Sequence, residues 1–153
     1  MDAGLFFIGE APGAREDAVG APFVGRSGRF LDSILAELGI DREEVFITNI
    51  VRCRPPGNRK PTKGEIMSCR PALIGELEAV RPKVVMALGA TAIYSLTGVR
   101  GKLSPIIGKE QNADFAGLHL TVIPCYHPSA AMRNSEMRVA FKKAVSRALA
   151  LSR

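Results

Sequence analysis

Short apolar runs alternate with segments of helical periodicity along the 153-residue chain. Each run is four to six residues long and rich in valine, isoleucine, leucine or phenylalanine, which is typical of strands that are buried on both faces. The expected strands are "LFFI" (5–8), "VFITNI" (45–50), "VVMAL" (84–88) and "HLTVIP" (119–124).

The segments between these runs show the spacing of amphipathic helices. Residues 27–38 place five apolar side chains on one helical face, and Gly39 follows as a C-terminal stop. Thr62 and Glu65 have the spacing of a capping box at the start of a second helix. Two further helices are expected over residues 90–97 and 136–151.

Strands that alternate with helices predict an α/β fold in which a parallel sheet is covered on both faces. Ligands bind such sheets beyond the carboxyl ends of the strands. The loops that begin there are "GEAPG", "VRCRPPGNR", "GATA" and "CYHPS". We therefore expect the chemically active residues of these loops to meet at one rim of the sheet.

Length and composition favour one ordinary globular domain over residues 1–153. No apolar run approaches the roughly 18 residues of a membrane span, and the N-terminus lacks the features of a signal peptide. Three widely spaced cysteines in such a chain indicate a reducing compartment, so we expect a cytoplasmic protein.

The net charge of +6 is unevenly distributed. Residues 1–79 contain 10 basic and 12 acidic residues, whereas residues 80–153 contain 11 basic and 3 acidic residues. This asymmetry favours a polyanionic partner, because neutralisation of phosphates drives nucleic-acid binding. From charge alone, a basic surface that serves solubility is the alternative.

A glycine-rich segment, "GEAPGAREDAVGAPFVGRSG" (9–28), follows the first expected strand. Its glycines let the backbone approach a ligand closely, but their spacing matches neither a dinucleotide fingerprint nor a P-loop. Phe23, between a proline and a valine, is suited to stack on a planar base. Local packing is the commoner role of a single phenylalanine in a loop.

Asn49 lies at the end of the second expected strand, where its amide offers a donor and an acceptor to the edge of a nucleobase. A turn-forming asparagine is the alternative. The following loop is stiffened by Pro55 and Pro56 and has no acidic residue before Gly64. Its basic residues, which suit phosphates unless they are merely solvated, are Arg52, Arg54, Arg59 and Lys60.

His127 follows the last expected strand and precedes a proline, which favours an extended backbone. A histidine at this place can donate a hydrogen bond to a developing anion, although a lone histidine is more often structural. Ser129 is expected to act as a helix N-cap that could hold a phosphate. The second histidine, His119, lacks such a context and is assigned no role.

Cys53 and Cys69 are separated by 15 residues. This is not a zinc pattern, because paired CxxC motifs are absent, and two thiolates cannot complete a four-cysteine cluster. From spacing alone, two buried free cysteines are the simpler interpretation.

Five motifs, taken in order, resemble the uracil-DNA glycosylase superfamily, most of all its iron-sulfur branch, family four, of bacteria and archaea. They span about residues 5 to 134 and are "GEAPG", "GAPFVGRSG", "ITNIVRCRPPGNRKP", "ALGATA" and "HPSAAMRN". Each motif is weak alone, whereas five in this order and at this spacing form a specific pattern.

The resemblance implies a three-layer α/β/α domain with a central four-stranded parallel sheet. It also implies hydrolysis of the N-glycosidic bond of deoxyuridine in DNA, single- or double-stranded, with the target nucleotide flipped into a pocket. We expect the protein to be a monomer.

The same resemblance assigns roles to individual residues. Phe23 is expected to stack on uracil, Asn49 to read its polar edge and His127 to stabilise charge on its O2 atom. The first motif, with Glu10 and Ala11, is expected to place the hydrolytic water and the backbone of the pocket, with Glu10 as the nearest carboxylate.

The resemblance also implies a DNA-binding surface. Ala131 stands at the position of the usual intercalating leucine, so the wedge would be Met132 or Arg133. The expected DNA contacts are Arg54, Arg59, Lys60, Ser129, Met132 and Arg133.

No cofactor is expected for the chemistry itself. Relatives in this branch carry a CxxC pair ahead of the first strand, which holds a [4Fe-4S] cluster together with the counterparts of Cys53 and Cys69. The printed sequence has no such pair before Leu5. We therefore expect either a truncated start or loss of the cluster, and Cys53 and Cys69 would be ligands only if others complete the set.

Two rival functions belong to different classes. A catalytically inactive or truncated relative would still bind DNA through the same surface. A hydrolase of free nucleosides would not need the basic surplus of residues 80–153.

Overall fold

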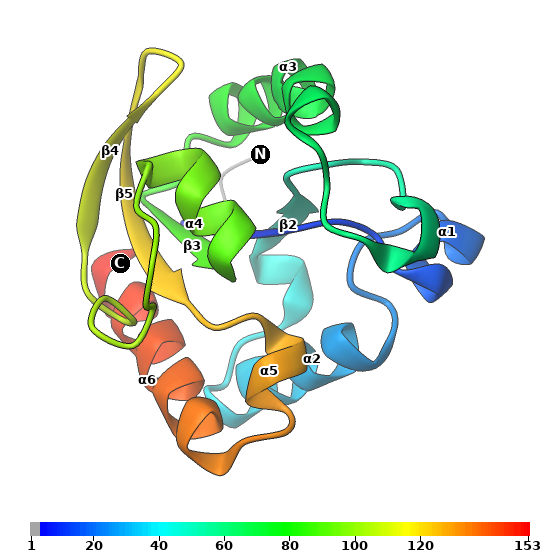
Figure 1. The fold of residues 1–153 in the computed structure, drawn as a ribbon. Coiled ribbons are helices and arrows are strands. Elements are labelled where there is room, and N and C mark those ends of the chain that lie inside the picture. The colour runs from blue at the N-terminus through cyan, green and yellow to red at the C-terminus, as the bar shows by residue number, and fades with distance from the viewer. Residues whose placement is uncertain (1–3) are drawn as a thin grey trace.

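The computed structural model describes residues 4–153, which form one sheet between two layers of helices (Figure 1). The sheet has five strands in the order β2-β1-β3-β5-β4. The strands are β1 Leu5–Gly9, β2 Phe46–Asn49, β3 Val84–Leu88, β4 Gln111–Phe115 and β5 Leu118–Cys125. The expected α/β/α architecture is confirmed.

Four of the strands are parallel and coincide with the four apolar runs of the sequence. β1 pairs with β2 and with β3, and β3 pairs with β5, all in the parallel sense. Their carboxyl ends therefore lie at the same edge of the sheet, which is the edge where α/β proteins bind ligands.

The fifth strand, β4, corrects the expectation of a four-stranded sheet. It pairs with β5 in the antiparallel sense through a tight turn, in which Ala116 (φ 51°) and Gly117 (φ 83°) both have left-handed backbone conformations. Only Ala113 and Phe115 of this edge strand are buried. A strand with alternating polar residues lacks the continuous apolar run by which the other four were predicted.

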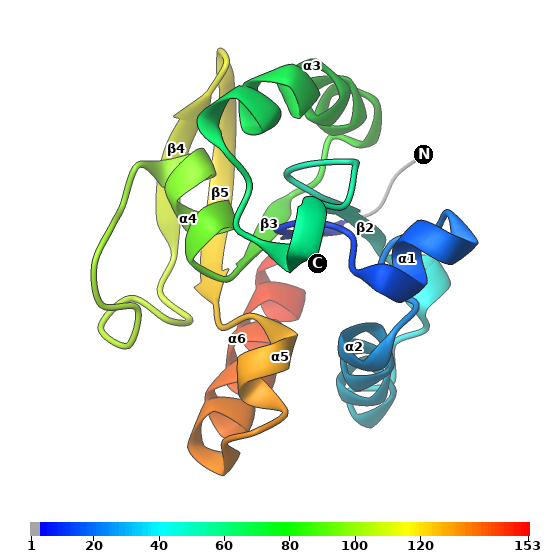
Figure 2. The ribbon, with the colours of Figure 1, turned by 45° about the vertical axis from the view of Figure 1, so that its right-hand side comes forward.

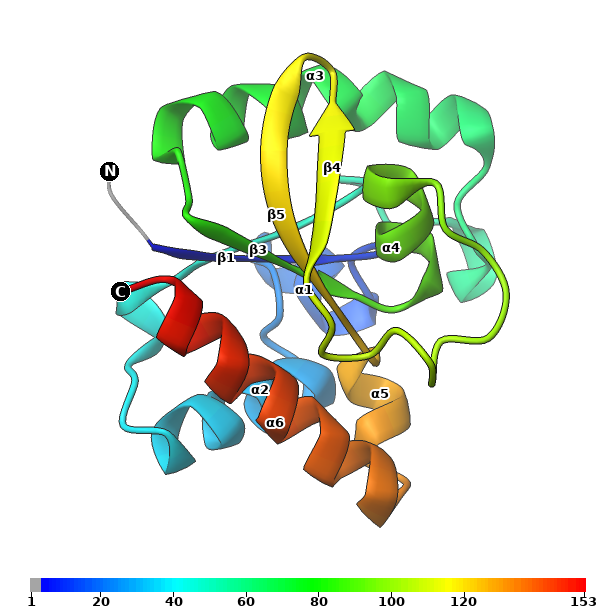
Figure 3. The ribbon, with the colours of Figure 1, turned by 90° about the vertical axis from the view of Figure 1, so that its left-hand side faces the viewer.

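Alternate residues of β1 point to opposite faces of the sheet and so belong to two separate core clusters. Phe7 shares its cluster with residues of α2 (Arg26–Glu37) and α6 (Ser135–Leu151). Phe6 shares the other with residues of α3 (Lys63–Val80) and α4 (Ala90–Thr97). Figures 2 and 3 show the two helix pairs on opposite sides of the sheet.

The helices predicted over residues 27–38, 90–97 and 136–151 are confirmed as α2, α4 and α6, each to within one residue at either end. The capping box of α3 is also confirmed, because Glu65 N–H donates to Thr62 Oγ1 (3.1 Å) and Thr62 N–H donates to Glu65 Oε1 (2.8 Å). Two short helices were not predicted, namely α1 (Ala14–Val19) and α5 (Pro128–Ala131). None of the helices within residues 4–153 combines the length and apolarity needed to cross a bilayer.

Candidate active site

A small pocket of about 130 Å³ lies at the carboxyl ends of the parallel strands. Its residues come from the segment after β1, the first turn of α2, the end of β2 and the segment after β5. They are Ala11, Gly13, Glu16, Phe23, Ser27, Asn49 and His127. The four residues expected to bind uracil are thus brought together. The volume suits a single small ring, because pockets for drug-sized ligands are several times larger.

Phe23 is held in the pocket wall by an unusual backbone conformation. It is 5% exposed and has a φ of 51°, in the left-handed region. Two glycines make room for it: a Cβ on Gly28 would lie 1.7 Å from the Phe23 carbonyl oxygen, and one on Gly9 would lie 2.5 Å from its ring. Arg42 adds hydrogen bonds to the carbonyls of Pro22 and Phe23. Gly9 and Gly28 therefore let the backbone come close to Phe23.

Glu16 ties the two ends of the glycine-rich segment together, a role that the sequence did not reveal. Its carboxylate accepts backbone N–H groups from Gly13 (3.0 Å), Val24 (2.9 Å) and Gly25 (2.5 Å). Burial raises the pKa of the Glu16 carboxyl, but the hydrogen bonds from Gly25, Gly13 and Val24 outweigh it and lower the pKa below its ordinary value. A carboxylate with three backbone donors stays ionised and fixes the loop on both sides of Phe23.

Asn49 presents a buried amide oxygen without a hydrogen-bond partner in residues 4–153. Its side chain is 5% exposed, and its Oδ1 atom accepts no hydrogen bond there. An unsatisfied buried polar atom typically destabilises a fold by about 1–3 kcal/mol. Such an atom in the wall of a pocket is available as a hydrogen-bond acceptor for a bound molecule.

Arg52 forms an ion pair with an acidic residue of α3. Its guanidinium makes two hydrogen bonds to the carboxylate of Glu76 on α3 (2.8 and 2.5 Å), and Thr48 Oγ1 donates to the same carboxylate (3.0 Å). Thr48 immediately precedes Asn49 on β2. The suggestion that Arg52 meets phosphates is therefore replaced by a structural one: it anchors the strand end that carries Asn49 to α3.

His127 is the N-cap of α5, with φ −66° and ψ 142°, so its predicted extended backbone is confirmed. Ser129 is the second residue of that helix and not its N-cap. Ser129 N–H donates to His127 Nδ1 (3.2 Å), and the Ser129 hydroxyl lies 2.8 Å from the same atom. Because Nδ1 acts as an acceptor, a neutral His127 carries its proton on Nε2.

The protonation state of His127 follows from its surroundings. Burial lowers the pKa of the imidazole below its ordinary value of 6.5, and the charge of Glu10 opposes this effect in part. A lowered pKa favours the neutral ring near pH 7, with Nε2–H available as a hydrogen-bond donor. The ring centroids of His127 and Phe23 lie 6.3 Å apart across the pocket.

Glu10 lies beside the pocket and is not one of its lining residues. It is half-buried directly after β1, and its backbone carbonyl accepts a hydrogen bond from Val51 N–H at 3.1 Å. Its charge reaches His127, as the pKa of that imidazole shows.

The residues expected to contact DNA lie in different surroundings. Lys60 and Arg133 are exposed, and Met132 is half-buried. Arg54 Nε donates to Asn58 Oδ1 (2.8 Å), which orients that side chain within its loop. Ala131 is 1% exposed, so it cannot enter a duplex without leaving the core.

Arg59 is already paired. Its guanidinium makes two hydrogen bonds to the carboxylate of Glu65 (2.7 and 3.0 Å). The Arg59 hydrogen bonds lower the pKa of Glu65 to about 2, so the pair stays charged at neutral pH. A DNA contact from Arg59 would therefore use the outer edge of a guanidinium that Glu65 holds.

Cys53 and Cys69 line the same hollow, next to the capping box of α3. Cys53 is exposed and Cys69 is half-buried, so the expectation of two buried cysteines is wrong, because both lie at an open hollow and not in the core. Arg52 N–H donates to Cys69 Sγ at 3.3 Å, a contact that suits a thiolate ligand. However, the part of the chain that the structure describes, residues 4–153, has no group of three or more His, Cys, Asp or Glu residues placed for a metal ion. These residues supply at most two of the four thiolates of a [4Fe-4S] cluster, so they do not fit the cluster by themselves.

Cys125 is a structural residue. It is fully buried at the end of β5, and burial raises the pKa of its thiol far above the ordinary value. A neutral, buried thiol is neither a nucleophile nor a metal ligand.

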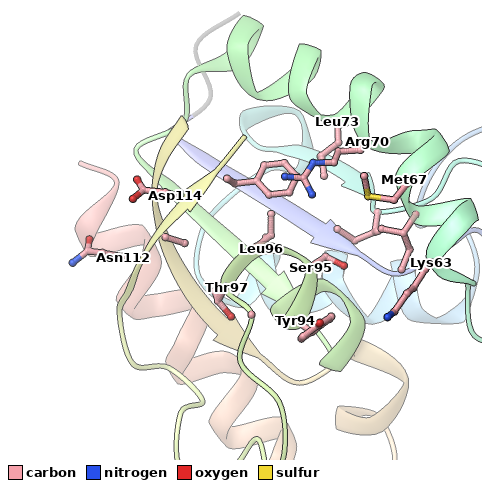
Figure 4. A pocket seen from close by; sticks show the side chains of 15 residues that line it. Lys63, Met67, Arg70, Leu73, Tyr94, Ser95, Leu96, Thr97, Asn112 and Asp114 are labelled. Atoms are coloured by element: carbon pink, nitrogen blue, oxygen red, sulfur yellow. The ribbon is translucent and has the colours of Figure 1, made fainter. Parts of the chain in front are cut away.

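A larger hollow lies elsewhere, between α3, α4 and β4, with a volume of about 540 Å³ (Figure 4). It shares no lining residue with the small pocket. Its walls combine buried Leu73 and Leu96 with exposed Met67 and Tyr94. We call it the α3–α4 groove.

Comparison with known proteins agrees with this arrangement. A family model for the uracil DNA glycosylase superfamily matches residues 1–150. A type-4 uracil-DNA glycosylase of Pyrobaculum aerophilum is 42% identical over 147 residues, covering 94% of this chain and 75% of that protein. One of Thermotoga maritima is 42% identical over 142 residues, covering 88% and 69%.

A type-5 uracil-DNA glycosylase of Pyrobaculum aerophilum is also similar, but less so. It is 37% identical over 97 residues, which cover 63% of this chain and 42% of that protein. The type-4 proteins named above therefore share more of the chain at higher identity. The match of the family model over nearly the whole chain shows that this protein belongs to the uracil-DNA glycosylase superfamily.

Proposed function

We propose that this chain is a uracil-DNA glycosylase of the type-4 kind, which releases uracil from DNA and so starts base-excision repair. The observation that carries the proposal is the buried amide oxygen of Asn49, which lacks a partner in the described residues and belongs to a residue that lines a ring-sized pocket together with Phe23 and a neutral His127. Membership of the superfamily and the likeness to type-4 proteins support the same function.

The pocket suits uracil in three respects. The ring of Phe23 offers a stacking surface, and the Asn49 amide offers hydrogen bonds to the polar edge of the base. His127 Nε2–H offers a donor to O2. Because a base inside a duplex cannot reach this pocket, the nucleotide must be flipped out of the helix.

Hydrolysis breaks the bond between C1′ and N1, and the electron pair of that bond leaves with N1 of uracil. The negative charge spreads to O2, where the hydrogen bond from His127 becomes stronger than in the bound substrate. The oxygen of a water molecule bonds to C1′, and its proton passes to a base, for which Glu10 is the nearest candidate carboxylate. These steps use side chains of the protein alone, and we propose that no metal takes part in them.

The DNA-binding surface would surround this pocket. Lys60, Arg54 and Arg59 suit the phosphate backbone on one side, and Arg133 on the other, with Met132 as the wedge. Ser129 would act mainly through His127, because its hydroxyl lies on the imidazole. We further propose that residues 1–153 act as a single domain and a monomer in the cytoplasm, on single- and double-stranded DNA.

The test is base release by the purified chain. Oligonucleotides with one deoxyuridine, single- or double-stranded, are incubated with excess protein, cleaved at abasic sites with alkali, and separated on a gel. We expect release of uracil from both substrates, no release from matched oligonucleotides with thymidine, and an unchanged rate in the presence of a chelator.

Two other outcomes would identify the rival functions. Binding of the deoxyuridine oligonucleotide without base release would indicate an inactive DNA-binding relative. Salt-insensitive cleavage of free deoxyuridine would indicate a nucleoside hydrolase, because DNA binding through phosphates weakens steeply with salt.

A further inference from the structure

The hydroxyl of Thr91 makes a short hydrogen bond to the carboxylate of Glu10. Thr91 Oγ1 donates to Glu10 Oε2 at 2.6 Å, across 81 positions of sequence. Thr91 belongs to the motif "ALGATA", whose individual side chains have no role in the chemistry described above. The contact therefore connects this motif to the carboxylate that the proposed function gives as the candidate base.

The start of α4 is shaped to receive a carboxylate from another segment. Thr91 is the second residue of α4 (Ala90–Thr97), and the N-cap residue, Gly89, has no side chain to contribute. Among the described residues of α4, the first turn holds no acidic side chain either. Glu10 brings a negative charge to this positive helix end, where the helix dipole favours it.

His127 lies at the same helix end. A Cβ on Gly89 would lie 3.1 Å from His127 Cβ, and Gly89 has a φ of 93° that other residues rarely adopt. Gly89 N–H donates to the carbonyl of Cys125 at 2.9 Å, which ties α4 to the end of β5. Thr91, Glu10 and His127 are therefore held on one side of the pocket by the same short helix.

We propose that Thr91 is a positioning residue for Glu10. Its hydroxyl holds Oε2 and leaves Oε1 to face the sugar of the flipped nucleotide and its hydrolytic water. A glutamate side chain with free rotamers would reach that orientation only part of the time, and holding it in place removes this loss. The inference rests on the proposed glycosylase function, because it assigns a geometry to that reaction.

The test compares Thr91→Val, which keeps the shape of the side chain and removes the hydroxyl, with Thr91→Ser, which keeps the hydroxyl. We expect Thr91→Val to lower the single-turnover rate of uracil release by about tenfold, as loss of one hydrogen bond to a charged group would. Affinity for the deoxyuridine oligonucleotide should be unchanged, and Thr91→Ser should restore most of the rate.

A double-mutant cycle separates this role from a structural tie. In a Glu10→Gln background, Thr91→Val should change the rate by less than about twofold, because a residue that acts through Glu10 has nothing left to position. The matched control is Thr97→Val at the other end of α4, where the hydroxyl bonds its own helix through Ile93 O (2.6 Å). This control should keep the rate of the unaltered protein.

The possible failures are distinguishable. An unaltered protein that releases no uracil contradicts the proposed function itself. An active protein in which Thr91→Val keeps the full rate, or in which the effects of Thr91→Val and Glu10→Gln multiply, overturns the role of Thr91 alone. A lower melting temperature of Thr91→Val with an unchanged rate would likewise show that the contact only stabilises the fold.

Discussion

The small pocket beside Asn49 and the α3–α4 groove are built in different ways, although both are open to a ligand. The pocket has about a quarter of the volume of the groove, about 130 against 540 Å³. The pocket nevertheless contains a buried amide oxygen without a partner in the described chain, a neutral imidazole and a phenylalanine with a left-handed backbone. In the groove, the charged side chain of Arg70 lies over the ring of Phe115 (4.4 Å to the centroid), so it is already engaged.

The difference comes from the parts of the fold that supply the residues. The pocket collects the carboxyl ends of parallel strands, where the sheet fixes the backbone and side chains from distant segments converge. The groove is formed between two helices and an edge strand. Under the proposed function, the chemistry therefore takes place where fixed polar atoms converge and not in the hollow of greater volume.

The largest expected effect contrasts the two hollows directly. His127→Ala removes the proposed donor to O2. It should slow the single-turnover release of uracil by raising the activation free energy by about 2–4 kcal/mol, as the loss of one oxyanion donor does. Met67→Ala in the groove removes an exposed side chain and should leave the rate within about twofold. Equal losses in the two variants would contradict the distinction between pocket and groove.

A second, smaller effect concerns which base the pocket accepts. Asn49→Asp exchanges the amide for a carboxylate, which offers no donor when ionised and places a charge at the polar edge of the base. We expect the ratio of uracil release to cytosine release to fall by about tenfold or more, since a buried polar group is left mispaired. The ratio is measured on matched single-stranded oligonucleotides, and an unchanged ratio would remove Asn49 from base recognition.

A third prediction tests whether the pocket is built by close backbone contacts. Gly28→Ala would place a Cβ within 1.7 Å of the Phe23 carbonyl oxygen, so we expect a loss of about 1–3 kcal/mol in the free energy of unfolding, together with slower base release. Gly75→Ala is the matched control, because a Cβ there meets nothing within 4 Å and the residue lies inside α3. Urea unfolding should show the control as stable as the unaltered protein or more so.

The smallest effect is a pH dependence of stability. Because burial lowers the folded-state pKa of His127 below 6.5, the unfolded chain takes up a proton first as the pH falls. Stability should therefore be lost as the pH falls from about 6.5 towards the folded-state pKa, by up to about 1.4 kcal/mol per pH unit. Between pH 7.5 and 5.5, the His127→Gln variant should lose less free energy of unfolding than the unaltered protein, as measured by urea unfolding. Equal losses would mean that His127 is not buried as a neutral ring.

Much of this arrangement follows from local sequence patterns. Four continuous apolar runs mark the parallel strands, and the parallel arrangement alone predicts that the segments after Ile8, Ile50 and Pro124 meet at one edge. For this reason the sequence patterns suffice to predict that Phe23, Asn49 and His127 lie together. The helix starts at Thr62 and after Leu88 are equally local features.

The parts that sequence patterns missed depend on partners far along the chain. Glu16 resembles any acidic residue of a short helix until the loop closes and three backbone N–H groups turn towards it. Arg52 resembles its neighbours Arg54 and Arg59 until α3 brings Glu76 alongside. Polar side chains take their roles from tertiary neighbours, which periodicity does not encode.

The left-handed backbone of Phe23 has a consequence for the affinity with which the pocket would bind a base. A non-glycine residue in that conformation is destabilised by roughly 1–2 kcal/mol, and this penalty is present in every folded copy before DNA arrives. The side chain is also buried, at 5% exposure, so under the proposed function a flipped base would meet a stacking surface that is already in place and would lose less binding energy to arranging one. The preorganisation of the proposed site would then depend in part on the backbone conformation of a single residue.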